Sequence, residues 1–109
     1  MWFKSSEKSN FRSELEKFRK TPDALLIDVR TEDEYWDSHI IGSINIPLNR
    51  IEDIKETIPD KNKSLFVYCR SGHRSGRAAE WLKAAGYTSV TDIGGMGNYN
   101  GSLKTKGQL

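Results

Sequence analysis

The fold is decided by one stretch, Leu65-Phe66-Val67-Tyr68-Cys69-Arg70-Ser71-Gly72-His73-Arg74-Ser75, followed by Gly76-Arg77-Ala78-Ala79-Glu80-Trp81-Leu82. It begins with an apolar, β-prone run, continues through a tight turn of small and polar residues, and ends in a segment of helical composition. The only cysteine stands where the predicted strand ends. We expect its thiol to face the backbone N–H groups of the turn and the positive end of the helix dipole.

Cationic or ionisable side chains cluster within eight positions of this cysteine, namely Arg70, His73, Arg74 and Arg77. Positive charge and N–H donors favour the thiolate, which is the nucleophilic form of cysteine. The alternative is a buried, inert thiol, the commoner fate of a lone cysteine after an apolar strand. The neighbouring charges, the flanking Gly72 and the helix start favour the reactive interpretation.

Length and composition predict one domain over residues 1–109, with a core at about residues 9–100 and a polar tail. No apolar run approaches the roughly 20 residues that span a bilayer, so no membrane segment is expected. The net charge is +2, and the basic residues are interleaved with 15 acids, which argues against a nucleic-acid partner.

The single cysteine excludes an internal disulfide and a thiolate-based four-ligand zinc site. The N-terminal residues 1–7 lack the apolar segment of a secretory signal. Together these features predict a protein of the reducing cytoplasm, with no metal.

Apolar spacing and breaker residues predict strands and helices in alternation. Strands are expected at 24–29, within 39–47, at 64–68 and at 89–93. Helices are expected from Ser9-Asn10 to a stop at Thr21-Pro22-Asp23, from Thr31 with a Glu34 capping box, over 48–58, and over about 75–85 before Gly86. A turn is expected at 94–97, and the tail 98–109 is expected to hold at most a short helix and a frayed end.

This alternation with short loops predicts an α/β domain with a parallel sheet and helices on both faces. Ligands of such sheets bind outside the carboxyl ends of the strands, which is where Cys69 falls. Asp28 and Arg30 stand at the end of another buried strand. We interpret them as a structural pair that orients the loops around the site. His39 is interpreted as a turn-stabilising histidine and Arg77 as a solvated helix residue, whereas Tyr35 and Trp36 could be core or pocket wall.

Four short motifs, in order, resemble the signatures of the rhodanese family: Leu26-Ile27-Asp28-Val29-Arg30 with Glu34-Tyr35 and His39-Ile40; Gly42-Ser43-Ile44-Asn45-Ile46-Pro47; Cys69-Arg70-Ser71-Gly72-His73-Arg74-Ser75; and Gly86-Tyr87 with Gly94-Gly95-Met96. The match runs from about Leu25 to Tyr99. The resemblance implies a rhodanese-like α/β fold with a central, mainly parallel sheet, and a single-domain sulfurtransferase.

The resemblance also implies a ping-pong reaction without metal or organic cofactor. The Cys69 thiolate would take a sulfane sulfur from a small anionic donor such as thiosulfate, and the resulting persulfide would pass it to cyanide or a thiol. The substrate-binding cradle would be formed by Arg70, Ser71, Gly72, His73 and Arg74, with Arg70 and Arg74 as the donor-binding charges, and Ser75 would support the loop. His73 is expected to bind the donor or simply to be solvated.

Two other functions stay open. A sulfur-relay or sensor module would carry the persulfide to a protein partner without turning over thiosulfate. A cysteine-dependent phosphatase would place five residues between its cysteine and arginine, whereas four residues separate Cys69 from Arg74. The shorter loop makes a smaller cradle, better matched to one sulfur than to a tetrahedral phosphate.

Overall fold

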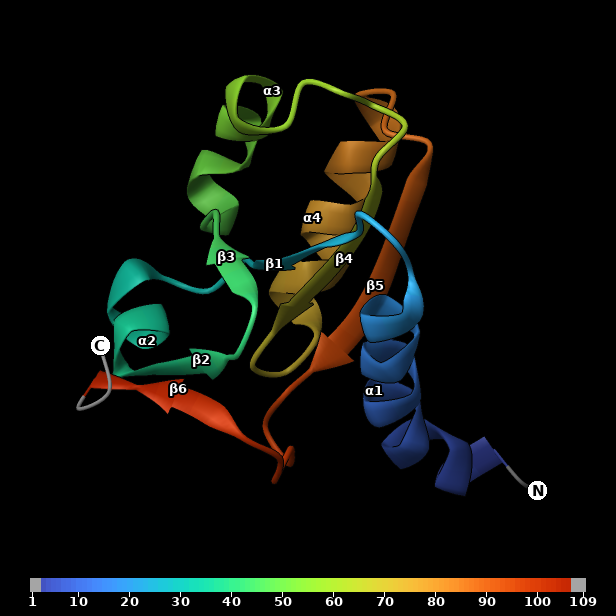
Figure 1. Cartoon of the computed structure of the whole chain (residues 1–109), viewed down its shortest axis with the longest axis vertical. Coiled ribbons are helices and arrows are strands. Elements are labelled where there is room, and N and C mark those ends of the chain that lie inside the picture. Colours follow the sequence, from blue (N-terminus) through green and yellow to red (C-terminus); the bar gives the residue numbers. More distant parts are fainter. Residues whose placement is uncertain (1–2, 107–109) are drawn as a thin grey trace.

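The computed structural model describes residues 3–106. Residues 1–2 and 107–109 lie outside the described part, including the predicted frayed end of the tail. The elements in chain order are α1 (Phe3–Lys20), β1 (Leu25–Asp28), α2 (Glu32–Asp37), β2 (Ser38–Ile40), β3 (Ser43–Asn45), the 3-10 helix η1 (Leu48–Asp53), α3 (Ile54–Thr57), β4 (Ser64–Cys69), α4 (His73–Ala84), β5 (Ser89–Gly95) and β6 (Leu103–Thr105) (Figure 1).

The centre of the fold is a four-stranded sheet in the order β3-β1-β4-β5, in which all neighbouring pairs are parallel. The predicted continuous apolar runs become β1 and β4, the two inner strands. Both strands are largely buried. Their side chains are mostly apolar in both directions because both faces of a parallel sheet are covered.

Alternate side chains of β4 enter two separate cores. Leu65, Val67 and Cys69 belong to a cluster with residues of α4, η1 and α3. Phe66 and Tyr68 belong to a second cluster that includes residues of α1. Successive side chains of a strand point to opposite faces of the sheet, so the two clusters lie on opposite faces. Helices cover each face. This confirms the predicted α/β architecture.

Two local predictions hold in detail. Thr31 caps α2, its hydroxyl accepting the N–H of Glu34 while the Glu34 carboxylate accepts the N–H of Thr31. Gly86 follows α4 with a φ of 100°, the left-handed conformation that ends many helices.

Several boundaries differ from the prediction. The first helix begins at Phe3 rather than after Ser9-Asn10, because cap-forming residues are only weak stop signals inside a segment that can continue as helix. The stretch 48–58 is divided into η1 and α3, with a non-helical Arg50. Gly94 and Gly95 belong to β5 rather than to a turn.

The tail contains a strand where at most a short helix was predicted. β6 pairs with β2 in an antiparallel sheet, with Ile40 opposite Leu103 and Ser38 opposite Thr105. Figure 1 shows this pair beside α2, at the end of the molecule away from α3. The strand depends on a partner more than 60 positions away along the chain, which is why local composition does not reveal it.

Candidate active site

Cys69 lies at the last position of β4, with no exposed surface. Its sulfur accepts the backbone N–H groups of Gly72 at 3.0 Å and of Ser75 at 3.3 Å. The Ser75 hydroxyl oxygen lies 3.5 Å from the sulfur. Backbone donors of this kind stabilise negative charge on sulfur, because charge-assisted hydrogen bonds are stronger than neutral ones. The predicted meeting of thiol, turn and helix start is confirmed.

The loop after Cys69 is held by its own residues on one side. Gly72 adopts a φ of 99°, a conformation that favours glycine, and leads directly into α4. The Ser75 hydroxyl donates to the Gly72 carbonyl at 3.2 Å. Ser75 therefore bonds the loop and contacts the sulfur, which fits its predicted supporting role.

The end of β5 and the residues that follow it also hold the loop. The N–H of Met96 donates to the Cys69 carbonyl at 2.9 Å, and the N–H of Gly97 donates to the Arg70 carbonyl at 3.0 Å. A Cβ on Gly95 would come within 2.5 Å of the Arg70 carbonyl oxygen. The glycine is needed because only a hydrogen fits between the strand and the loop.

The two arginines predicted to bind the donor both face one carboxylate. Arg74 donates to Glu34 through both terminal nitrogens, at 2.7 and 3.1 Å. The Nε of Arg70 lies 3.8 Å from the same carboxylate, although the Arg70 side chain is 63% exposed. The hydrogen bonds with Glu34 raise the pKa of Arg74. Arg74 is therefore held in place as a cation, and the Glu34 carboxylate offsets part of its charge.

Asp28 and Arg30, at and just after the end of β1, form a buried ion pair. The guanidinium of Arg30 donates twice to the Asp28 carboxylate, at 3.0 and 2.7 Å, and also to the Ser38 carbonyl at 2.7 Å. The pair joins the end of β1 to Ser38, the first residue of β2. This geometry fits the orienting role expected from the sequence, which stays a prediction.

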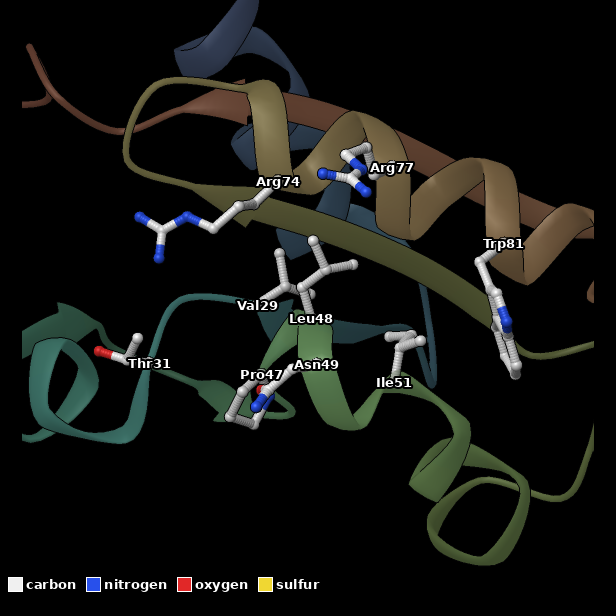
Figure 2. Close-up of a pocket in the computed structure, with 9 residues that line it drawn as sticks. All are labelled: Val29, Thr31, Pro47, Leu48, Asn49, Ile51, Arg74, Arg77 and Trp81. Carbon is white, nitrogen blue, oxygen red and sulfur yellow. The ribbon is translucent and has the colours of Figure 1, made fainter.

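A groove of about 510 Å³ runs beside the loop between α4 and η1. Figure 2 shows Val29 and Leu48 at its centre and Trp81 at its far end. The Arg74 side chain points away from this apolar centre, consistent with its bonds to α2. A second hollow, of about 600 Å³, touches the loop at Arg70 and Ser71 on the side of α1. Neither hollow is lined by Cys69 itself.

A model of the rhodanese-like domain matches residues 11–102. The chain belongs to the rhodanese-like domain family. It is 45% identical to the thiosulfate sulfurtransferase PspE of Escherichia coli (strain K12) over 71 residues, 64% of this chain and 68% of PspE. The solved structure of a rhodanese with anions from E. coli matches with a TM-score of 0.69 and 40% identity, covering 75% of this chain and 98% of that one. A candidate sulfur carrier protein of Bacillus subtilis (strain 168), YrkF, is 33% identical over 95 residues, which cover 83% of this chain and 51% of YrkF.

The rhodanese-like domain brings most of the predicted loop residues together. Ser71 and His73 are exposed, and the Ser71 hydroxyl lies 3.3 Å from Nδ1 of His73. His39 is buried, its Nδ1 lies 2.8 Å from the Tyr35 carbonyl and its ring stacks on Tyr35. These contacts fit a structural residue, but His39 lies in strand β2 rather than in the predicted turn. Trp36 is more than half exposed and is not a core residue.

Two residues at the site were not recognised in that role from the sequence. Glu34 was predicted as part of a capping box and of the first motif, and Gly95 as part of a turn and of the fourth motif, but neither was given a role at the site. Their contacts join residues 40 and 25 positions apart in the chain, so no local signal gives these contacts. Among residues 3–106, no cluster of acids, histidines or cysteine is suited to a metal ion. Within the same range, no helix has the length and apolar character to cross a membrane.

The Glu34 carboxylate makes the stability of the domain sensitive to acid. Hydrogen bonds from Arg74 and, less strongly, from Thr31 lower its pKa from 4.5 to about 2. Since the pKa is lower in the folded state, the contribution of Glu34 to stability is complete above about pH 4.5 and is lost as the pH falls toward 2. We expect the difference in unfolding free energy between the wild type and Glu34→Gln to stay constant from about pH 8 to pH 5 and to shrink by pH 3.

Urea unfolding at pH 7, 5 and 3 measures this difference. Glu32→Gln is the matched control, because Glu32 lies on the same helix and, within residues 3–106, its ion pair is with the exposed Arg50 at 3.4 Å. A difference for Glu34→Gln that stays unchanged down to pH 3 would contradict the prediction.

Proposed function

We propose that this rhodanese-like domain is a sulfurtransferase in which Cys69 carries the transferred sulfur as a persulfide. The observation that carries the proposal is the Cys69 sulfur with two backbone N–H donors, at 3.0 and 3.3 Å, at the start of a helix. Similarity to the thiosulfate sulfurtransferase PspE supports the same chemistry.

The first half-reaction forms a sulfur–sulfur bond on the enzyme. The Cys69 thiolate attacks the sulfane sulfur of thiosulfate, the sulfur–sulfur bond of the donor breaks, and sulfite leaves with the electron pair. The product is an enzyme persulfide anion. The N–H donors and the nearby arginines stabilise the anionic states on both sides of this step.

The second half-reaction returns the enzyme to its starting state. An acceptor attacks the outer sulfur, and the Cys69 thiolate leaves. With cyanide the product is thiocyanate, and with a thiolate it is a new persulfide. No net oxidation takes place and no organic cofactor is required. The cytoplasmic location and the single-domain organisation remain predictions from the sequence.

A protein relay is the second candidate. It is favoured by the similarity to the candidate sulfur carrier protein YrkF, of which this chain spans about half. In that function the same persulfide would be passed to a partner protein instead of a small acceptor. The two candidates share the first chemical intermediate and differ in the donor and acceptor that react rapidly.

Intact-mass spectrometry after incubation with thiosulfate, and again after addition of cyanide, tests the proposal. We expect a gain of one sulfur, about 32 Da, that cyanide removes. No gain, with the thiol still open to alkylation, would overturn thiosulfate as the donor. Transfer from a protein persulfide would then support the relay, whereas hydrolysis of an aryl phosphate would support a phosphatase.

A further inference from the structure

One carboxylate offsets the positive charge of the sulfur-binding loop. Glu34 accepts two hydrogen bonds from Arg74 and lies 3.8 Å from Arg70. Arg70, Arg74 and Glu34 together therefore carry about one net positive charge, not the two that the arginines would carry alone.

The position of this carboxylate is fixed from a second direction. Glu34 also accepts the backbone N–H of Thr31 at 2.9 Å and the Thr31 hydroxyl at 3.1 Å. These bonds form part of the capping box that begins α2. Glu34 cannot turn away from the arginines without breaking the cap, and its side chain is only 25% exposed. The negative charge is thus held in a fixed position beside the two arginines.

We propose that Glu34 controls which anionic sulfur donors the loop accepts, by reducing the preference of its arginines for dianions over singly charged donors. This inference rests on the proposed sulfurtransferase function. A donor held near Arg70 and Arg74 lies close to the Glu34 carboxylate as well. The repulsion from Glu34 acts twice as strongly on a dianion as on a monoanion.

Two donors of nearly equal size separate charge from shape. Thiosulfate is a dianion, and methanethiosulfonate is a monoanion in which a methyl group replaces one oxygen. In Glu34→Gln, we expect the ratio of kcat/KM for thiosulfate to that for methanethiosulfonate to rise about 3- to 10-fold, as expected for removing one nearby charge at a protein surface. Sulfur release from both donors is followed with cyanide as the common acceptor.

The substitution preserves the local fold. Glutamine at this position of a capping box accepts the same backbone N–H, so α2 keeps its cap. Thermal unfolding of the variant checks this. Glu32→Gln is the control on the same helix and should leave the ratio unchanged, because Glu32 contacts neither loop arginine. Arg74→Gln should change the ratio in the opposite direction.

The outcomes are distinct. A ratio that stays unchanged in Glu34→Gln, even if kcat/KM for both donors changes by the same factor, would overturn the inference and leave Glu34 with a structural role. Failure of the wild type to take up sulfur from either donor would instead contradict the proposed function. A rise in the ratio confined to Glu34→Gln supports charge selection by this residue.

Discussion

Cys69→Ser is expected to abolish sulfur transfer, lowering kcat/KM with thiosulfate at least about 1,000-fold. A serine hydroxyl is not ionised near neutral pH, and its oxygen cannot take the place of the thiolate as the sulfur acceptor. The backbone donors from Gly72 and Ser75 would remain, but they act on an atom that lacks the negative charge they stabilise. Thiocyanate production and the 32 Da mass gain should both be absent.

The same variant should stay folded, because it changes one atom at a buried position. Its unfolding midpoint therefore serves as the control for the activity measurement. A folded variant that still forms thiocyanate would place the nucleophile elsewhere and contradict the mechanism. A folded, inactive variant excludes the inert-thiol interpretation but does not distinguish the enzyme from the relay.

Gly95→Ala is expected to destabilise the protein by about 1–3 kcal/mol, the usual cost of forcing atoms into a packed region. Its Cβ would lie 2.5 Å from the Arg70 carbonyl oxygen and 2.8 Å from the Ser71 backbone. Both neighbours are main-chain atoms of the active-site loop, so the clash can be relieved only by moving β5 or the loop. We also expect slower sulfur transfer, since such a movement disturbs the donors that face Cys69.

Two other glycines provide matched controls. A Cβ on Gly76 in α4 would meet only the Asp92 carboxylate at 3.6 Å, so Gly76→Ala should be neutral or stabilise by up to about 1 kcal/mol. Gly94 has open space but a φ of 91°, so Gly94→Ala should cost about 1–2 kcal/mol through strain alone. Urea unfolding of the three variants gives the comparison. If Gly95→Ala proves as mild as Gly76→Ala, the strand and loop are not in tight contact.

Local features of the fold were accessible from the sequence because neighbouring residues determine them. The Thr31–Glu34 cap depends on two side chains three positions apart and forms as predicted. Cys69 lies between a strand and a helix because the apolar run, the glycine and the helical segment adjoin one another. The sheet class followed from the alternation of such segments. The rhodanese resemblance depended on the same short motifs.

The tertiary structure alone decided how the site is assembled around the cysteine. It brings Glu34 to Arg74 across 40 positions, Gly95 beneath Arg70, and the tail strand β6 to β2. These contacts depend on the order and register of the strands. A local stretch of sequence does not fix either of them, because the same stretch can pair with different partners. The sequence by itself predicted the proposed nucleophile, Cys69, and the loop that follows it. Packing between distant segments placed the Glu34 carboxylate beside Arg70 and Arg74 of that loop.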